Sequence, residues 1–265
     1  MINNVPNFEN TIVLITGAAG NIGGALVHGF ADLGADLILV DNNESALVEL
    51  SKRIEIDYAV KTSSYTCDLE DAISRTDLID KLLKDFSKID VLINCAAIVA
   101  SQNLPGWTTS WPSQELESWN RGIEVNLTSV FHLTKGLTPL LMKSRSASVI
   151  NFGSLYAFLG PDWSLYEGTE MGNSASYSAS KGGLLQLTRW LATTLAPNIR
   201  VNALSPGGVF RSQDSRFVAR FESRTPLGRM AIESDLVGPC VFLASSLSSY
   251  ITGQNLIVDG GWSVW

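Results

Sequence analysis

The 265-residue chain is poor in the residues that bind metals and form disulfide bonds. It contains only two histidines, His28 and His132, and no cluster of histidine with cysteine, so we expect no metal site. The three cysteines are isolated and odd in number, which argues against a disulfide framework. We therefore expect Cys67, Cys95 and Cys240 to be reduced thiols in a cytoplasmic protein.

Positive charge and long apolar runs are also scarce. Nineteen lysines and arginines against 26 acidic residues give a net charge of −7, which argues against nucleic-acid binding. No apolar run is long enough to span a membrane, and the polar first ten residues lack the pattern of a signal peptide. Hydrophobic residues make up 45% of the chain, and no linker interrupts it. We expect one domain over residues 1–265, with a small molecule as partner.

Short apolar runs alternate with longer amphipathic ones along the chain. We expect helices such as those at 22–33, closed by Gly34, and at 44–54. The alternation predicts an α/β fold, a Rossmann-like doubly wound parallel sheet of about seven strands with helices on both faces. Ligands of such sheets bind at the carboxyl ends of the strands. The expected strands are 11–16, 36–41, a third ending at 67–68, 89–94, 148–152, 199–204 and 255–258.

A glycine-rich turn follows the first predicted strand. Gly17, Gly20 and Gly23 stand between that strand and a predicted helix. Glycines let a backbone approach a pyrophosphate closely, and a helix N-terminus offers free N–H groups and a positive dipole. Glycines also serve plain turns, but a strand before, a helix after and an acid at the end of the next strand are the context of a dinucleotide site.

That acid is Asp41, the last residue of the second predicted strand. A carboxylate at this place accepts hydrogen bonds from the adenosine ribose and repels a 2′-phosphate, which favours NAD(H) over NADP(H). The neighbouring Asn42 and Asn43 are neutral. The alternative is that Asp41 only caps the strand end. Asp68, after the third strand, either binds the adenine amino group or serves as a turn residue.

Tyr177 and Lys181 are spaced i and i+4, so both rise from one face if the segment is helical. The ordinary pKa of a phenol is about 10. A cation beside the phenol favours the phenolate and lowers that pKa, and a lysine helped by a positively charged cofactor ring would supply it. A shared solvated helix face is the alternative interpretation.

Together these motifs resemble the short-chain dehydrogenase/reductase family, over nearly the whole chain. The segment 166–169 is also similar to members that modify bacterial surface sugars and flagellin. The matching pieces are the turn at 16–23, the run 94–97, Asn126, Ser154, Tyr177 with Lys181, the pair 206–207, and the closing 253–254 and 259–261.

The resemblance implies NAD(P)-dependent hydride transfer at a carbinol or carbonyl carbon. It implies that Tyr177 is the general acid/base, that Lys181 binds the nicotinamide ribose and lowers the pKa of Tyr177, that Ser154 holds the substrate oxygen, and that Asn126 holds a water of a proton relay. Ser154 as a helix cap and Asn126 as an interior polar residue are the alternatives. The expected cofactor site comprises Gly17, Gly20, Asn21, Ile22, Gly23, Asp41, Asp68, Leu69, Asn94, Ala96, Tyr177, Lys181, Pro206, Gly207 and Val209.

The chain departs from the family pattern in three places. Asn21 stands where the single-domain members usually carry glycine, and Cys95 and Ala97 stand where asparagine and glycine are usual. The stretch between Ser154 and Tyr177 is also longer than usual, with an insertion at about 160–173. We expect this insertion to form a wall of the substrate pocket, although a surface loop without ligand contact is the alternative.

The expected substrate is a sugar, a polyol or a nucleotide-activated sugar, with Ser154, Tyr166 and Arg211 as candidate binding residues. Tyr166 lies in the insertion, and Arg211 lies in a segment at about 207–230 that the resemblance implies is a substrate lid. Arginine grips phosphate and carboxylate groups well. The other lid arginines at 216, 220 and 224 have the i,i+4 spacing of one solvated helix face.

Two other functions remain open. The glycine spacing resembles that of epimerases and dehydratases, which hold NAD tightly, and a non-catalytic dinucleotide sensor is the second alternative. The resemblance implies a homotetramer or homodimer, with apolar stretches at 126–142 and 176–195 as candidate contacts. We expect the aromatic tail at 262–265 to pack at a subunit contact or over an active site.

Overall fold

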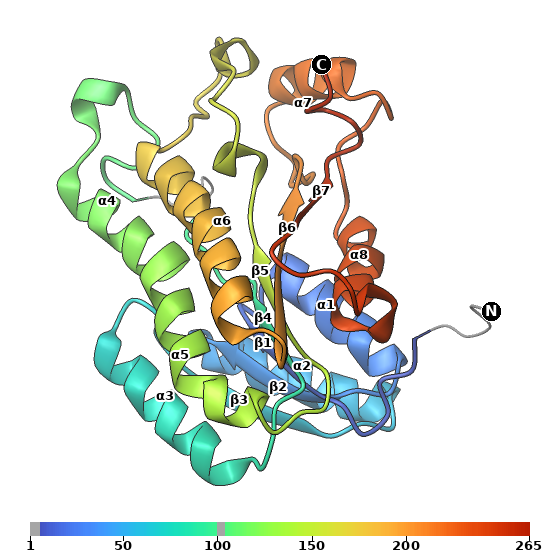
Figure 1. The fold of residues 1–265 in the computed structure, drawn as a ribbon. Helices are drawn as coiled ribbons and strands as arrows, with labels where there is room; N and C mark the ends of the chain where they lie inside the picture. The colour runs from blue at the N-terminus through green and yellow to red at the C-terminus, as the bar shows by residue number, and fades with distance from the viewer. Residues whose placement is uncertain (1–5, 100–103) are drawn as a thin grey trace.

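A seven-stranded parallel sheet lies at the centre of the computed structural model, which describes residues 6–99 and 104–265 (Figure 1). The strand order is β3-β2-β1-β4-β5-β6-β7, and each neighbouring pair is parallel. The predicted doubly wound fold is therefore confirmed. The strands are β1 (Ile12–Thr16), β2 (Asp36–Asp41), β3 (Thr62–Thr66), β4 (Val91–Asn94), β5 (Ala147–Phe152), β6 (Ile199–Pro206) and β7 (Asn255–Val258).

Successive strand residues enter two different cores, because strand side chains alternate between the faces of a sheet. In β1, Val13 and Ile15 pack into one core and Leu14 into the other. In β4, Ile93 and Leu92 divide in the same way. Apolar side chains on both faces explain why β1, β2 and β4 are nearly continuous apolar runs.

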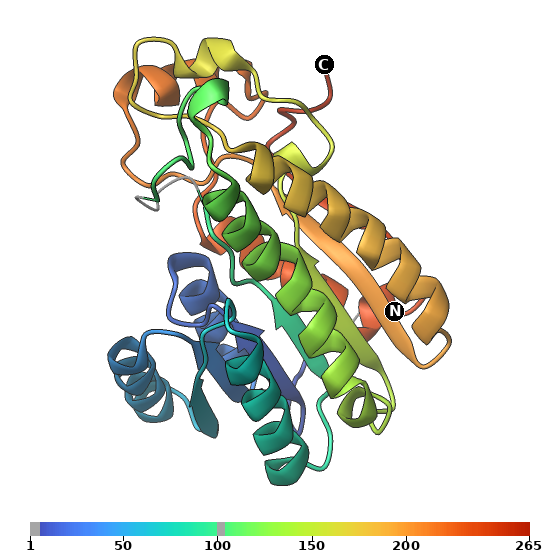
Figure 2. The same ribbon diagram turned by 90° about the vertical axis from the view of Figure 1, so that its left-hand side faces the viewer.

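Two layers of helices cover these cores (Figures 1 and 2). One face is covered by α1 (Asn21–Asp32), α2 (Glu44–Asp57) and α8 (Ser234–Ala244). The other is covered by α3 (Ala72–Asp85), α5 (Ser129–Leu141) and α6 (Ala175–Leu195). The short α4 (Leu116–Ile123) packs against α6. No helix in the described part of the chain is both long and apolar enough to cross a membrane.

The ends of several elements differ from those predicted by one to three residues. Helix α1 ends as expected, with Gly34 at φ +87° and its N–H bonded to the Ala31 carbonyl. Strand β4 begins two residues later than predicted, because the Ile89 N–H bonds to the Leu140 carbonyl of α5 instead of a strand partner. Strands β1, β2, β4, β5 and β7 end where predicted, whereas β6 runs two residues further, to Pro206, and β3 ends slightly earlier, at Thr66. These carboxyl ends position the site.

Two irregular segments lie side by side beyond the carboxyl ends of the strands (Figure 2). One is the insertion, which contains the short 3-10 helix η4 (Trp163–Tyr166). The other contains α7 (Ser215–Arg224), and it follows β6 directly. Apolar residues of both segments form a third, smaller core: Leu155, Leu165, Tyr166, Phe217, Phe221, Met230 and Trp262.

Candidate active site

The glycine turn after β1 is packed too tightly for any side chain. Gly17 has φ +67°, and a Cβ atom there would lie 2.8 Å from the Ala96 Cα. A Cβ atom on Gly23 would lie 1.9 Å from the Gly17 carbonyl oxygen, so that glycine is obligatory. Thr16 fixes the neighbouring turn, because its hydroxyl accepts the N–H groups of Cys95 and Ala96 at 3.1 and 3.2 Å. The sequence reasoning did not single out this role of Thr16.

Helix α1 begins directly after this turn, and the N–H groups of its first turn have no partner within the helix. Gly20 is the N-cap residue, and no side chain caps the helix. Asn21 and Ile22 form the first turn, where the helix dipole favours an anion. The Asp41 carboxylate accepts the N–H groups of Ala19 and Asn43 at 3.0 and 3.1 Å. A bare glycine turn, an uncapped helix and a strand-end carboxylate are the features that fit a dinucleotide.

The turn after β3 is held by an arginine that the sequence reasoning missed. Arg75 is buried, and its guanidinium donates to the Leu69 carbonyl and to the Glu124 carboxylate, both at 2.5 Å. Its Nε also donates to His132 at 3.2 Å. Asp68 accepts the Glu70 N–H at 2.9 Å, as a turn residue does. Arg75 therefore ties the predicted adenine side of the site to the segment that precedes Asn126.

Asn94 and Asn126 have buried side chains that hold the structure together around the site. Asn94 donates to Asn151 at 2.9 Å, so its side chain lies between strands and any cofactor contact falls to its backbone. Asn126 lies in the π-turn η2 (Glu124–Thr128), between α4 and α5. Its carboxamide bonds to both the N–H and the carbonyl of Ile98, at 2.7 and 3.1 Å. A π-turn within a helix is frequently found at functional sites.

Ser154, Tyr177 and Lys181 come together at the carboxyl ends of β5 and β6. Ser154 follows β5, while Tyr177 and Lys181 rise from α6. The Lys181 Nζ lies 5.9 Å from the centroid of the Tyr177 ring. All three line one cavity of about 530 Å³, with Pro206, Gly207 and Val209 from the end of β6. Tyr177 and Lys181 therefore face the cavity from one side of α6, and do not form the solvated helix face that was the alternative.

In the chain by itself the pKa of Tyr177 is raised, and its lowering by Lys181 together with a positively charged cofactor ring stays a prediction. Burial raises the pKa of the phenol, and a hydrogen bond with Ser154 only partly opposes that effect. Lys181 is itself buried, which lowers the pKa of its ammonium to about 8. Its Nζ donates to the Phe152 carbonyl at 2.6 Å instead of to the phenol. Desolvation therefore outweighs the effect of this cation on Tyr177.

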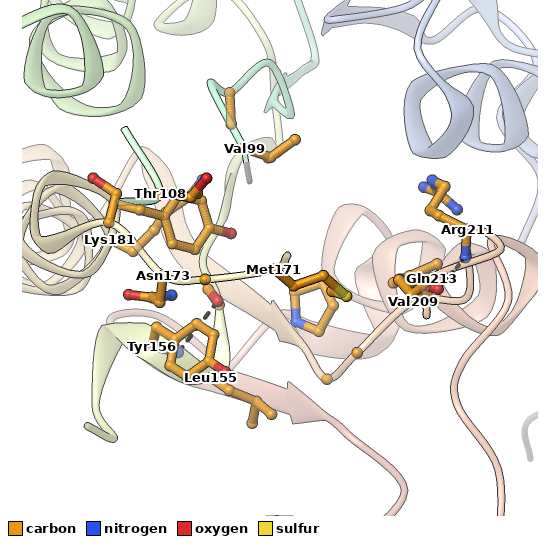
Figure 3. A pocket seen from close by; sticks show the side chains of 18 of the residues that line it. Val99, Thr108, Leu155, Tyr156, Met171, Asn173, Lys181, Val209, Arg211 and Gln213 are labelled. Atoms are coloured by element: carbon orange, nitrogen blue, oxygen red, sulfur yellow. Dashed lines mark hydrogen bonds between the residues drawn. The ribbon is translucent and has the colours of Figure 1, made fainter. Parts of the chain in front are cut away.

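Two cations, Lys181 and Arg211, lie on opposite sides of the cavity, each with neutral polar neighbours (Figure 3). Lys181, Asn173 and Tyr156 lie on one side, and Arg211 with Gln213 on the other. Arg211 forms a salt bridge with Glu233, so a substrate anion would have to compete with that carboxylate. Ile22, Cys95 and Ala97 line the cavity near the glycine turn, which joins the catalytic and cofactor regions.

The insertion does form a wall of this cavity, as expected. Tyr166 lines the cavity and is nearly buried, and its hydroxyl lies 2.5 Å from that of Tyr156. Burial raises the pKa of both phenols, so both are neutral hydrogen-bonding groups at ordinary pH. The Tyr166 ring also packs against Phe217 of α7 at 5.3 Å between centroids.

The arginines of α7 are not one solvated face, which corrects the expectation from their spacing. Arg224 forms a salt bridge with Asp162 of the insertion. Arg220 donates to the carbonyls of Glu167 and Leu165 at 2.6 and 3.3 Å. Only Arg216 matches the expectation, as an exposed partner of Asp214. The helix forms as predicted, but two of its cations fasten the insertion to the 207–230 segment.

The aromatic tail packs against the back of the cavity wall. Trp262 is 5% exposed and stacks on Phe221, with centroids 5.6 Å apart and an interplanar angle of 16°. The Arg224 guanidinium lies over the Trp262 ring, and Trp265 donates to the Arg224 carbonyl at 3.0 Å. The tail thus packs against α7, whose Phe221 lines the cavity, while Trp262 itself does not line it.

Comparisons with known proteins agree with this geometry. The family model described as enoyl-(acyl carrier protein) reductase, of the short-chain dehydrogenase type, matches residues 17–263. A probable galactose dehydrogenase of Rhizobium meliloti is 33% identical over 97% of this chain and 96% of that protein. A post-translational flagellin modification protein A of Campylobacter coli is 30% identical over 97% of this chain and 99% of that protein.

A solved structure shares the fold over its full length. It is a putative NAD(P)-dependent gluconate 5-dehydrogenase from Beutenbergia cavernae with bound NADP at low occupancy. The identity is 30%, the TM-score is 0.86, and the match covers 98% of this chain and 99% of that one. This chain belongs to the short-chain dehydrogenase/reductase family. It is an oxidoreductase of the class that acts on CH–OH groups.

Proposed function

We propose that the protein transfers a hydride between a nicotinamide dinucleotide and a secondary alcohol or ketone of a sugar or polyol. The observation that carries this proposal is the convergence of Ser154, Tyr177 and Lys181 on one cavity, beside an uncapped helix N-terminus and a bare glycine turn. The bound nicotinamide supplies the hydride acceptor or donor.

Each residue of the group has a separate task. Ser154 donates a hydrogen bond to the substrate oxygen and stabilises the charge that develops there. Tyr177 takes the hydroxyl proton when the alcohol is oxidised, and returns it when the ketone is reduced. Lys181 holds the nicotinamide ribose and adds positive charge near the phenol. Asn126 holds a water of the proton path, from a π-turn fixed by Ile98.

The cavity suits a polyhydroxylated substrate. Neutral hydroxyl-binding groups line it, among them Thr108, Tyr156, Tyr166 and Asn173, together with the carboxylate of Glu170. Relatives named for galactose and gluconate point to the same chemistry. We propose that the 207–230 segment acts as the lid, and that Arg211 exchanges its Glu233 partner for an acidic group of the substrate.

We propose NAD(H) as the preferred cofactor, because Asp41 places a carboxylate where a 2′-phosphate would lie. The presence of NADP in the Beutenbergia cavernae structure makes this preference a matter for measurement. We also propose a homodimer or homotetramer, since Phe131 of α5 and Trp190 of α6 leave 44% and 55% of their surface exposed. The free thiols Cys67 and Cys240 are consistent with the reducing cytoplasm.

The test is a screen of galactose, gluconate, mannitol and related sugars with NAD⁺ and with NADP⁺, followed by absorbance of the reduced cofactor. We expect net formation of NADH with at least one sugar or polyol. Turnover of a sugar with bound NAD released on denaturation, but with no net NADH, would instead indicate an epimerase. Cofactor binding without turnover of any alcohol or ketone would contradict the proposal.

A further inference from the structure

A second hollow adjoins the active-site cavity and shares part of its wall. This outer groove has a volume of about 660 Å³ and lies between the 104–114 loop and the insertion. The two hollows have five lining residues in common: Thr108, Tyr166, Met171, Gly172 and Asn173. A ligand seated at Tyr177 therefore has room to extend outward past these residues.

Two tryptophans line the outer groove from opposite segments. Trp111 and Trp163 leave 75% and 57% of their surface exposed. The Trp163 ring packs against the Tyr166 ring, with 5.8 Å between the centroids. Large indole rings left in water at a groove mark a binding surface, and their faces pack well against the C–H face of a sugar ring.

Asn173 presents a fixed donor at the junction of the two hollows. It is 5% exposed, and its Oδ1 accepts the Ser178 hydroxyl at 2.9 Å, which sets the orientation of the amide. Asn173 lines both hollows, and the amide end opposite this Oδ1 is a donor. The junction is therefore suited to a hydroxyl or a glycosidic oxygen of a ligand.

The groove carries no charged side chain among the described residues that line it. The charged residues next in sequence to its lining are all acidic: Glu115, Asp162, Glu167 and Glu170. A nucleotide diphosphate would find no cation there, whereas an uncharged sugar ring needs only stacking and neutral hydrogen bonds. This narrows the expected substrate by disfavouring a nucleotide-activated sugar.

We propose that the outer groove is a subsite for a second, uncharged glycosyl ring, and that the preferred substrate is a disaccharide or glycoside. The inference rests on the proposed function for the reacting ring, because that ring must lie at Tyr177. The second ring stacks on Trp111 and Trp163, and Asn173 donates to the linkage between the rings.

The test compares lactose, maltose and cellobiose with galactose and glucose, by calorimetric binding and by turnover with NAD⁺. We expect at least one disaccharide to bind at least about tenfold more tightly than its component monosaccharides. Trp111→Ala and Trp163→Ala should each remove most of that advantage and leave monosaccharide binding unchanged. Tyr250→Ala, which removes a fully exposed aromatic ring elsewhere, is the matched control and should preserve it.

Several results would overturn the subsite. One is equal affinity for monosaccharides and disaccharides. Another is tighter binding of UDP-galactose than of any disaccharide, lost in the same tryptophan variants. A third is a tryptophan variant that changes the mass of the oligomer but leaves the ratio of disaccharide to monosaccharide affinity unchanged. The two proposals fail separately. Disaccharide binding that depends on the tryptophans, without any redox turnover, would keep the subsite and contradict the hydride transfer. Turnover of monosaccharides without tighter binding of disaccharides would keep the hydride transfer and contradict the subsite.

Discussion

Replacing Lys181 with methionine should stabilise the protein at neutral pH while removing its activity. The ammonium is 3% exposed, and burial lowers its pKa from 10.5 to about 8. That gap corresponds to about 3 kcal/mol of unfavourable burial while the group is charged. Methionine avoids this penalty but loses the hydrogen bond from the charged ammonium to the Phe152 carbonyl, worth about 2 kcal/mol. We therefore expect Lys181→Met to gain about 1 kcal/mol of unfolding free energy at pH 7.

The sign of the pH dependence follows from the same group. Below pH 8 the ammonium is charged in both the folded and the unfolded chain, so the whole penalty is present. Between pH 8 and 10.5 the folded chain loses its proton first, and the wild type gains stability as the pH rises. The advantage of the variant should therefore shrink across this window and reverse before its upper end, where only the lost hydrogen bond remains.

Urea unfolding followed by circular dichroism, at fixed protein concentration and at several values from pH 7 to 10.5, measures this difference. The titration of tyrosines far from Lys181 is common to both proteins and cancels. Lys143→Met removes an exposed lysine and is the matched control, with a difference that should not change with pH. A Lys181→Met variant that is less stable than wild type at pH 7, or whose advantage is the same at every pH, would refute the reasoning.

Three further predictions concern the site. Ser154→Ala should lower kcat/KM about 100-fold. It should also move the rising limb of the pH profile for alcohol oxidation to higher pH, because the lost hydroxyl no longer lowers the pKa of Tyr177, the base in that direction; an unmoved limb argues against this. Arg75→Met should lower the unfolding free energy by about 2 kcal/mol in urea, because it leaves Glu124 and the Leu69 carbonyl without their partner, and Arg75→Lys should lose less. Asp41→Ala should shift the kcat/KM ratio toward NADP⁺ by at least about tenfold, and an unchanged ratio would mean that this carboxylate does not select the cofactor.

The fold was predictable because the sheet is covered on both faces. Strands such as β1, β2 and β4 are then short apolar runs bounded by turn residues, and the carboxyl end of each is visible in the sequence. Those ends include Thr16, Asp41 and Asn94, which the structure places at one edge of the sheet. The edge strand β3 is polar, and only its approximate end was predicted. The beginnings of the strands were less predictable, because a tertiary bond such as that from Ile89 to Leu140 decides where pairing starts.

The salt-bridge partners of Arg75 and Arg224 were not predictable, because they lie far away along the chain. Arg75 of α3 pairs with Glu124 of η2, and Arg224 of α7 pairs with Asp162, which precedes η4. Spacing within α7 indicated only that its arginines share a face, and could not show that the insertion covers that face. The raised pKa of Tyr177 in the chain by itself was not predictable for a related reason, since motif spacing carries no information about desolvation.

The central claim is that Tyr177 is the proton-transfer residue of a hydride-transfer site. The most direct test is the single-turnover rate of cofactor reduction by Tyr177→Phe, with the dissociation constant for NADH measured in parallel. We expect the rate to fall by at least about 1,000-fold while NADH binding changes less than about twofold, and Tyr65→Phe, on β3, to behave as wild type. A Tyr177→Phe rate close to that of wild type would contradict the account.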